Sequence, residues 1–380
     1  MAGVGHVLRC RDCGQAAGPR NWRCPACGGL LRIEWDGLAP AQRVDAIRKD
    51  VWRYRPMLPA VEPSSIVTLG EGATPVVWID RWAAAHHLDR VGVKLEYLNP
   101  TGSFKDRGTT TLVSHARSLG LTRLIEDSSG NAGASVAAYA AQAGMNATIY
   151  VPATAPPAKR AQIARVGAEI VPIDGPRAAV TEAALAEVAR SGAYYAGHNA
   201  NPYFVAGMAT FAYELIEDLG ASMPRHLVIP TGGGSLCVGS FEGFLRWFDD
   251  PDEARRRCPR IHAVQSRGCA PLVAAFDRGL DRVPPIEREK TVAGGIEVER
   301  PPRDREILQA IRATGGSAVA VDDEEILFQR RLLAETEGID VEPTTAAAFA
   351  GLAQLARTGA IAAAEIVVVA ATGAGWKDPG

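Results

Sequence analysis

The sequence predicts an α/β protein with two doubly wound parallel-sheet domains and a small metal-binding module ahead of them. The chain has 380 residues, 47% of them hydrophobic, so it can bury more than one core. From residue 92 onward, short apolar runs alternate with amphipathic helical patterns that glycine closes. Such alternation is typical of parallel sheets covered by helices on both faces. Four of the seven cysteines stand within the first 27 residues, which indicates a separate module there.

Charge and hydropathy exclude several classes of partner. The net charge is −2 and basic residues are scattered, so we expect no nucleic-acid partner. The short run 255–257 is interpreted as a solvated helix face. No apolar run reaches the roughly 18 residues that would span a bilayer, so we expect no membrane partner. The first residues lack a basic segment followed by an apolar one, so we expect a cytoplasmic protein without a signal peptide.

The N-terminal cysteines form two CxxC pairs separated by ten residues, namely Cys10, Cys13, Cys24 and Cys27. Two residues between thiolates let a tight turn present both sulfurs to one ion, and four sulfurs suit tetrahedral Zn²⁺. A segment this short has little core, so metal binding would fold it. We therefore predict a structural zinc ribbon over residues 1–38, with a pair of redox motifs or a ribbon that has lost its metal as alternatives.

The other cysteines, Cys237, Cys258 and Cys269, lie far apart and are interpreted as buried or incidental. An odd total argues against a disulfide framework. Residues 39–68 are predicted to be a linker arm, with a helix over 41–51 followed by a proline-rich stretch.

Strands and helices are expected to alternate through the remainder. The expected strands are 92–97, 121–126, 147–151, 169–173, 226–229, 260–264, 318–321 and 366–370. The expected helices are one that follows residue 105, then 132–144, 159–166, 178–190, 202–219 and one that ends at Gly338. The last begins with a predicted capping box, Asp322-x-x-Glu325. Ligands in such folds bind outside the carboxyl ends of strands, where the remaining motifs fall.

The candidate catalytic residue is Lys105, in the stretch Asn-Pro-Thr-Gly-Ser-Phe-Lys-Asp-Arg-Gly-Thr at 99–109. It follows an apparent strand and a Pro–Gly turn, and it precedes a helical pattern. Helix-end dipoles at such a junction are expected to help lower the pKa of the amine. A neutral amine held there can form a Schiff base with an aldehyde. The alternative is an ordinary solvated lysine.

The segment Asp-Ser-Ser-Gly-Asn-Ala-Gly at 127–133 joins a strand to a helix. Its small residues expose backbone N–H groups, and a helix N-terminus attracts an anion, so it is predicted to bind a carboxylate or phosphate. The amide of Asn131 can donate to an oxyanion. A simple glycine-rich turn is the alternative.

A third motif, Pro-Thr-Gly-Gly-Gly-Ser-Leu at 230–236, also links a strand to a helix. Three consecutive glycines let the main chain wrap a phosphate with several N–H donors. The segment lacks the GK[ST] ending of a nucleotide P-loop. A further small-residue segment, at 370–378, ends the last strand and contains Thr372; a strand-end glycine turn is its alternative reading.

These motifs together resemble those of the threonine synthase family, which are fold-type II (tryptophan synthase β-like) pyridoxal-phosphate (PLP) enzymes. The segments 69–75, 201–210 and 337–348 also match, so the resemblance covers residues 69–378. It implies a large PLP domain over 69–106 and 207–380, a smaller inserted domain over 107–206, and a homodimer. The ribbon occurs in many prokaryotic members of the family.

The resemblance also implies a role for each motif. Lys105 would carry the cofactor, with Phe104 beside it, and Asn131 would contact the PLP phenolate oxygen. The residues implied for the 5′-phosphate are Gly232, Gly233, Gly234, Ser235 and Leu236. The residues implied for the substrate α-carboxylate are Ser128, Ser129, Gly130, Asn131, Ala132 and Gly133. Thr372 would face the pyridine nitrogen, and a hydroxyl there makes the cofactor a milder electron sink, suited to elimination and replacement.

Three segments depart from the usual threonine synthase pattern. Ala374 stands where a histidine is usual, Thr344 and Thr345 occupy a segment that often reads Glu-Pro-Ser/Ala-Ser, and 291–301 looks closer to threonine dehydratases. In the family these segments border the substrate side chain.

The predicted function is a PLP-dependent lyase of amino-acid biosynthesis that converts O-phospho-L-homoserine and water to L-threonine and phosphate. One alternative is β-elimination or β-replacement on serine, threonine or phosphoserine, as in dehydratases or cysteate synthases. A non-catalytic, ribbon-bearing paralogue is a third possibility, against which the intact motifs argue. Lys159 and Arg160, at an expected helix start, are candidates for a distal substrate phosphate.

Overall fold

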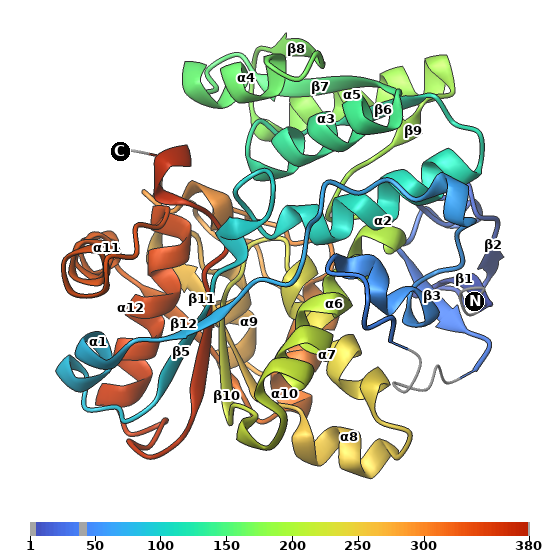
Figure 1. Cartoon of the computed structure of the whole chain (residues 1–380). Helices are drawn as coiled ribbons and strands as arrows, with labels where there is room; N and C mark the ends of the chain where they lie inside the picture. The colour runs from blue at the N-terminus through green and yellow to red at the C-terminus, as the bar shows by residue number, and fades with distance from the viewer. Residues whose placement is uncertain (1–4, 38–43, 379–380) are drawn as a thin grey trace. The chain divides into compact units, whose positions relative to one another are not determined.

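The computed structural model describes residues 5–37 and 44–378, and its contacts divide the chain into two compact units (Figure 1). Unit 1 contains the N-terminal part of the chain through Ala73, together with Asn99–Thr101 and Lys105–Thr210. Unit 2 contains Thr74–Leu98, Gly102–Phe104 and the chain from Phe211 onward. The chain therefore crosses between the units at the residue that precedes Lys105.

The first part of unit 1 is a three-stranded antiparallel sheet with strand order β2-β1-β3. Its strands are β1 (His6–Cys10), β2 (Ala16–Ala17) and β3 (Leu31–Trp35). The buried side chains of Leu8 and Leu31 pack with Tyr203, so this sheet has a small apolar contact with the rest of unit 1.

The arm that follows differs from its prediction. Of the expected helix over 41–51, residues 41–43 lie outside the described part, and residues 44–50 are not helical. A 3-10 helix instead starts at Val51 and runs through Met57, with the Asp50 side chain accepting a hydrogen bond from the Trp52 backbone N–H. Pro56 in this segment has no N–H to donate, so an α-helix is not continued there. A second 3-10 helix spans Pro63–Ser65.

Unit 1 also contains a four-stranded parallel sheet with order β8-β7-β6-β9. Its strands are β6 (Arg123–Glu126), β7 (Asn146–Pro152), β8 (Glu169–Ile173) and β9 (Tyr194–Tyr195). The helices are α2 (Lys105–Ser118), α3 (Asn131–Ala143), α4 (Pro157–Ala164), α5 (Arg177–Ser191) and the first half of α6 (Pro202–Leu219).

Helices α3 and α5 cover opposite faces of this sheet. Side chains alternate along a strand, so Ile149 and Tyr150 of β7 point to opposite faces. Ile149 lies against Gly133 of α3, whereas Tyr150 packs with Val180 and Ala184 of α5. The sheet is therefore enclosed between helices, as the alternating pattern predicts.

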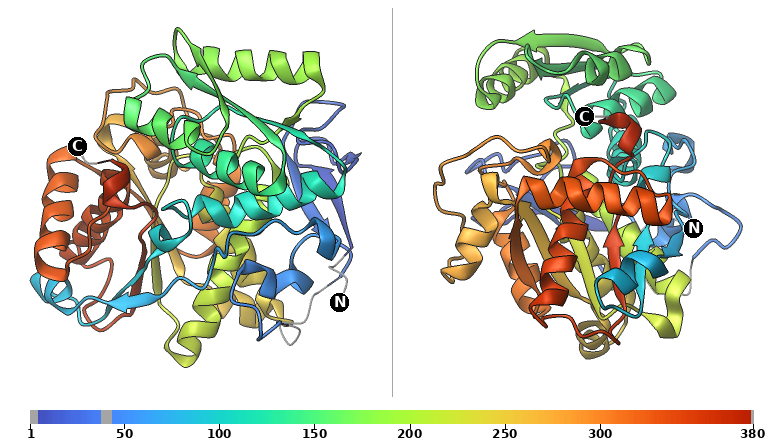
Figure 2. Two further views of the ribbon diagram at one scale, coloured as in Figure 1. Left: turned by 45° about the horizontal axis from the view of Figure 1, so that its top comes forward. Right: turned by 90° about the vertical axis from the view of Figure 1, so that its left-hand side faces the viewer.

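Unit 2 is built on a six-stranded sheet with order β12-β11-β10-β13-β5-β4. Five strands are parallel, and only the edge strand β4 (Val76–Trp78) is antiparallel. The parallel strands are β5 (Val91–Lys94), β10 (His226–Pro230), β11 (Arg260–Ser266), β12 (Ser317–Val321) and β13 (Val367–Ala370). Figures 1 and 2 show α12 against one face of this sheet, with α7 and α10 on the other.

The helices against the two faces are α7 (Ser235–Trp247), α10 (Asp304–Ala313) and α12 (Pro343–Arg357). The main core cluster of unit 2 includes Val228, Val264 and Val369 of the central strands together with Phe349 of α12. The remaining helices are α1 (Asp80–Ala85), α8 (Pro251–Arg257), α9 (Pro271–Asp277) and α11 (Asp323–Glu337).

The expected strands and helices beyond residue 90 are confirmed, with ends that differ by a few residues. The prediction of a capping box before α11 is wrong. Asp322 is the N-cap residue of α11, but its side chain makes no capping hydrogen bond. The carboxylate pairs with Arg267 at 2.5 Å, and Glu325 accepts from the Gln329 amide at 2.8 Å. Both acids therefore bind a charged or amide side chain here rather than a backbone N–H. Gly338 ends the helix at positive φ, as predicted.

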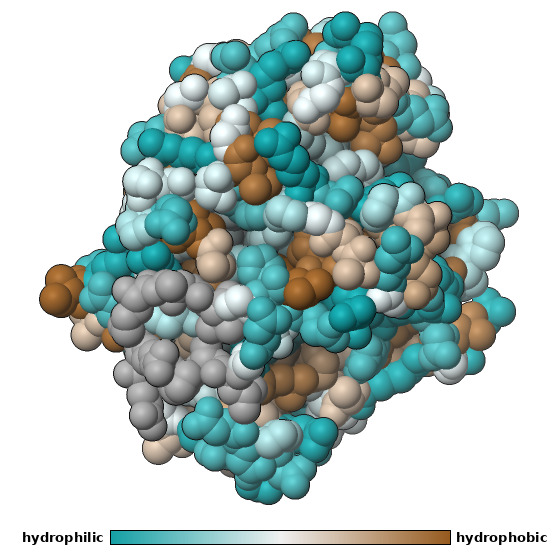
Figure 3. All heavy atoms as spheres, turned by 90° about the vertical axis from the view of Figure 1, so that its right-hand side faces the viewer, coloured by the Kyte–Doolittle hydropathy of each residue, from teal (hydrophilic) through white to brown (hydrophobic). Residues whose placement is uncertain are grey.

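Among the described residues, no helix is long and apolar enough to cross a bilayer. The face in Figure 3 is mostly hydrophilic, with apolar residues in small separate groups. The three later cysteines lie in the interior or at its margin: Cys237 and Cys269 are buried and Cys258 is partly so. Burial raises the pKa of the Cys237 thiol to about 12, as expected of an unreactive core residue.

Candidate functional site

Lys105 is the first residue of α2 and is half-buried. Its neighbour Asp106 is fully buried and is held by three short hydrogen bonds. The Asp106 carboxylate accepts from the Thr101 backbone N–H at 2.7 Å, the Thr101 hydroxyl at 2.6 Å and the Ser135 hydroxyl at 2.6 Å. Together these fix the backbone around Lys105. Sequence reasoning missed Asp106 and Ser135; an acid in the first turn of a helix was the available signal.

The predicted carboxylate loop lies in the same unit, where β6 ends and α3 begins. Gly130 is the N-cap of α3 and no side chain caps this end, so the first-turn N–H groups point into the loop. A Cβ on Gly133 would lie 1.9 Å from the carbonyl oxygen of Ser128, so only glycine permits this turn. The Ser128 hydroxyl accepts from the Gly130 N–H at 3.3 Å and folds the loop onto itself.

In unit 2, the triple glycine connects β10 to α7. Gly234 is the N-cap of α7 with φ +82°, and no side chain caps the helix. A Cβ on Gly232 would lie 2.9 Å from the Cα of Ile296, and one on Gly234 would lie 2.1 Å from the Cδ1 of Ile307. The close packing requires glycine at both positions, and the uncapped helix end suits an anion such as phosphate.

Thr372 follows β13 in unit 2 and is buried. Its hydroxyl lies 3.0 Å from the hydroxyl of Thr345, which also accepts the Gly373 N–H at 3.0 Å. The backbone N–H of Phe104 donates to the Thr372 carbonyl at 3.1 Å. The segment that leads to Lys105 is thereby tied to the end of β13. The role of Thr345 was not predicted, although its position in the departing segment was noted.

The three segments that depart from the threonine synthase pattern contact one another in unit 2. Val341 forms a bridge with Ala374, and the Glu342 N–H donates to the Gly373 carbonyl at 3.1 Å. The backbone N–H of Gly295, within 291–301, donates to the Thr344 hydroxyl at 3.0 Å. Of the three, the segment 291–301 borders the triple-glycine loop, because a Cβ on Gly232 would meet Ile296 and Val298. The departures therefore fall in one region.

The four N-terminal cysteines come together as predicted. All their sulfur atoms lie within 4.8 Å of one another, with separations of 3.5 Å for Cys10–Cys27 and 3.6 Å for Cys13–Cys24. A tetrahedral Zn²⁺ with bonds of about 2.3 Å places its sulfur ligands about 3.8 Å apart. The arrangement fits such an ion, and all four cysteines are unbridged by disulfides.

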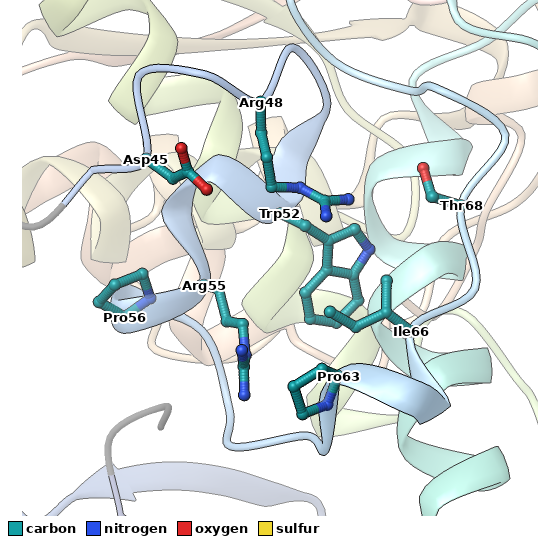
Figure 4. Close-up of a pocket in the computed structure, with 8 residues that line it drawn as sticks. All are labelled: Asp45, Arg48, Trp52, Arg55, Pro56, Pro63, Ile66 and Thr68. Atoms are coloured by element: carbon teal, nitrogen blue, oxygen red, sulfur yellow. The ribbon is translucent and has the colours of Figure 1, made fainter. Parts of the chain in front are cut away.

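Two surface hollows lie elsewhere in unit 1. The hollow in Figure 4, of about 350 Å³, is lined by arm residues such as Arg48, Trp52 and Arg55 and contains none of the predicted site residues. A second, open hollow of about 430 Å³ is lined by Arg160 of α4 together with Ile170 and Pro172 of β8. Since β8 is the edge strand of its sheet, Arg160 lies beside that edge.

The structure thus groups the predicted site residues by unit. Unit 1 holds Lys105 and the loop Ser128–Gly133. Unit 2 holds Phe104, Gly232–Leu236 and Thr372. The uncapped N-termini of α3 and α7 suit the carboxylate of an amino acid and the phosphate of PLP. The buried hydroxyl of Thr372 suits the ring nitrogen of PLP. The residues present therefore fit the cofactor.

Comparison with known families gives one extended match. The family described as "Pyridoxal-phosphate dependent enzyme" matches residues 67–373. Threonine synthase of Methanosarcina acetivorans is 34% identical, over 98% of this chain and 92% of its own. That of Methanocaldococcus jannaschii is 33% identical, over 98% and 93%. The Synechocystis threonine synthase is 34% identical, over 93% and 87%.

Solved structures show the same fold. A PLP-dependent aspartate racemase superimposes with a TM-score of 0.69 at 22% identity, covering 79% of this chain and 90% of its own. Threonine deaminase isoform 2 of Solanum lycopersicum gives a TM-score of 0.67 at 22% identity, with 79% of each chain covered. The fungal L-serine ammonia-lyase of Rhizomucor miehei gives 0.68 at 23% identity, covering 80% and 94%.

Proposed function

Because the chain belongs to the threonine synthase family of pyridoxal-phosphate-dependent enzymes, we propose that it converts O-phospho-L-homoserine and water to L-threonine and phosphate. The observation that carries this proposal is similarity to curated threonine synthases over nearly the whole chain, ribbon included. The enzyme is a PLP-dependent lyase. The shared length matters because a common fold alone hosts many reactions.

Lys105 is the residue to which we assign the cofactor aldehyde and proton transfer. Bound PLP supplies an electron sink for negative charge at the substrate Cα. The Lys105 amine, at the fixed start of α2, removes and returns protons at the substrate carbon. Asn131 would donate its amide to the cofactor's phenolate oxygen, and Phe104 would lie beside the ring. Thr372 offers its hydroxyl to the ring nitrogen.

Two helix N-termini would hold the anionic groups. Backbone N–H groups of Gly232, Gly233, Gly234, Ser235 and Leu236 bind the 5′-phosphate, supported by the uncapped start of α7. The loop of Ser128, Ser129, Gly130, Asn131, Ala132 and Gly133 binds the substrate α-carboxylate, supported by the uncapped start of α3. Lys159 and Arg160 of α4 are the candidate ligands for the distal phosphate, and Arg160 lines the hollow at the edge strand.

The proposal includes two features of the whole protein. Cys10, Cys13, Cys24 and Cys27 bind one structural Zn²⁺, which the sulfur separations support. The protein is a homodimer, an expectation that rests on the family resemblance.

A second candidate is β-elimination or β-replacement on serine, threonine or phosphoserine. It is favoured by the packing of 291–301 on Gly232 and by the hydrogen bond from Gly295 to Thr344, since both segments depart from the threonine synthase pattern. This reaction needs no proton removal at Cβ. It would release ammonia and a keto acid, or incorporate a nucleophile.

Product analysis separates the two candidates. The purified, PLP-loaded protein is incubated separately with O-phospho-L-homoserine, O-phospho-L-serine and L-threonine. We expect equal amounts of threonine and phosphate from phosphohomoserine, and no keto acid from threonine. If phosphohomoserine stays intact while threonine or phosphoserine is consumed, the second candidate replaces the first.

A further inference from the structure

A buried acid lies beside the predicted carboxylate loop and has no part in the mechanism above. Glu126 ends β6, two residues before Ser128, and its side chain is fully buried. One carboxyl oxygen, Oε1, lies 2.8 Å from Nδ1 of His198. The other, Oε2, is buried and has no hydrogen-bond partner in the part of the chain that the structure describes. An ionised carboxylate would normally fill such an acceptor with donors.

The charges around Glu126 favour its neutral form. Burial, followed by the adjacent Asp127, raises its pKa well above 4.5. Arg177 of α5, Lys105 of α2 and the backbone of His198 oppose this shift only in part. Arg177 is engaged elsewhere, since it donates to Asp127 at 2.9 Å. The Asp127 carboxylate also accepts from the hydroxyls of Tyr195 at 2.9 Å and Thr181 at 2.5 Å, so Asp127 has the donors that Glu126 lacks.

His198 is the partner that completes a neutral pair. Its side chain is 13% exposed, and Phe204 packs against the ring edge-on at 5.8 Å. Burial, then Lys105 and Arg177, lower its pKa well below 6.5. A neutral imidazole accepts the carboxylic proton of Glu126 at Nδ1 and carries its own hydrogen on Nε2. An imidazolium–carboxylate pair would instead bury two charges.

We propose that Glu126 is a proton-bearing positioning residue, which must be uncharged for an amino-acid carboxylate to bind at the Ser128–Gly133 loop. This inference deepens the proposed function and depends on its assignment of the loop to the substrate carboxylate. An ionised Glu126 would place a second negative charge, after Asp127, on the strand end that leads into the loop assigned to the substrate carboxylate. Like charges in a poorly solvated site repel strongly. Binding of the substrate carboxylate therefore requires that Glu126 keeps its proton.

The proposal sets the direction of a pH effect. Below the pKa of Glu126, the affinity for the amino acid does not depend on this group. Above that pKa, the affinity falls by about tenfold per pH unit, because only the protonated form binds. Glu126→Gln keeps the shape and a donor but cannot ionise, so its affinity should lack this component.

The first experiment observes the proton in the protein itself, without cofactor or substrate. Infrared difference spectra compare the wild type with Glu126→Gln at neutral pH. We expect the carbonyl band of a protonated carboxylic acid in the wild type and its absence in the variant. Glu169→Gln, in the exposed edge strand of the same sheet, is the matched control and should keep the band. Absence of a protonated carboxyl band in the wild type would overturn the proposal.

The second experiment titrates the PLP-loaded protein with L-threonine and with L-serine over a range of pH, and follows the visible absorbance. We then divide the wild-type Kd by the Kd of Glu126→Gln at each pH. Effects of pH on the ligand amine and on Lys105 are common to both proteins, so they cancel in this ratio. We expect this ratio to rise by about tenfold per pH unit above the pH at which Glu126 loses its proton. A ratio that is constant with pH contradicts the proposal.

The two tests also separate this inference from the proposed function. If the protein fails to make threonine but binds an amino acid with this pH dependence, the function is wrong and the inference stands. If Glu126→Gln does not fold, a pH titration of the wild-type infrared band, with and without L-threonine, replaces it. Bound threonine should then shift the loss of the band to higher pH, and an unshifted titration would refute the link.

Discussion

At the scale of single residues, the chemistry depends on backbone positions that only particular side chains permit. Lys105 occupies the first position of α2, and buried Asp106 binds both the loop before it and Ser135 of α3. The lysine is therefore held by its neighbour's hydrogen bonds. The anion loops depend in turn on glycine, because a side chain at Gly133 or Gly234 would overlap its surroundings.

Replacement of the lysine tests the cofactor assignment. Lys105→Ala should abolish the visible absorbance of the PLP-treated protein, because no other amine would hold the aldehyde. The exposed Lys49→Ala is the control and should keep the spectrum. Borohydride reduction and peptide mapping should place the cofactor on the peptide that contains Lys105. Finding it on another lysine would overturn the assignment.

A methyl group added at the carboxylate loop should affect substrate more than cofactor. In Gly133→Ala the new Cβ would meet the Ser128 carbonyl, so the loop must shift. We expect KM for the amino acid to rise by about tenfold or more, while the visible absorbance is retained. Gly144→Ala, at the open C-terminal end of the same helix, should lower only stability, by about 1 kcal/mol. Equal KM changes in both variants would argue against a loop role.

At the scale of elements, the N-terminal sheet is attached to unit 1 by aromatic contacts. Trp22 lies 4.5 Å from the ring of Tyr195, and His6 contacts Tyr203 at 5.7 Å. His115 of α2 stacks on Tyr203 at 3.4 Å and donates from Nε2 to the Pro19 carbonyl at 2.8 Å. The apolar area behind these contacts is small, so the sheet should need its metal to stay folded.

Metal content tests this view. Elemental analysis should find about one zinc per chain, because four thiolates saturate one tetrahedral ion. Replacing Cys10, Cys13, Cys24 and Cys27 together by serine should unfold or release the N-terminal sheet. The visible absorbance of bound PLP should largely persist, since the cofactor residues lie in other elements. Native protein that contains two disulfides and no metal would contradict the prediction.

Lowering the pH should weaken the attachment of the N-terminal sheet, because His115 becomes protonated. Burial lowers the pKa of its imidazole from 6.5 to about 4. The unfolded state therefore binds the proton first, and stability present above pH 6.5 is lost as the pH falls toward 4. The loss approaches about 3 kcal/mol, from 2.5 pKa units at about 1.4 kcal/mol each.

The variant His115→Gln isolates this effect from any protonation of the four N-terminal cysteines. It keeps an N–H donor but cannot titrate, so its melting temperature should fall less than that of the wild type between pH 6.5 and 4. The exposed His87→Asn serves as control and should follow the wild type. Parallel curves for the wild type and His115→Gln would show that His115 does not carry the effect.

At the scale of the whole molecule, each unit has its own parallel sheet and core, and the chain visits both several times. Phe104 belongs to unit 2 and Lys105 to unit 1. The candidate catalytic residue therefore lies where the chain passes from one unit to the other. The proposed homodimer predicts a mass in solution of about twice the 40.2 kDa of the chain. Sedimentation or light scattering measures it, and a mass near 40.2 kDa would exclude the dimer.

The sequence by itself predicted most of the elements and the candidate ligand-binding motifs. Apolar periodicity and glycine at helix ends act over a few residues, so α6, β8 and the end of α11 at Gly338 could be predicted closely. The spacing of the two CxxC pairs likewise predicted that four sulfur atoms come together. The arm was predicted wrongly, because the Asp50 side chain accepts from the Trp52 N–H and starts a 3-10 helix at Val51, whereas the composition of 41–51 favours a helix that would end there.

Only the tertiary structure decided which distant side chains meet. Glu126 and His198 are 72 residues apart, and their pairing follows from β6 lying beside β9. Asp322 could have capped α11, but its carboxylate instead accepts a hydrogen bond from the charged side chain of Arg267, which is 55 residues away. Thr345 reaches Thr372 because α12 packs on the sheet that β13 belongs to. Such contacts depend on long-range packing, which leaves no local pattern in the chain.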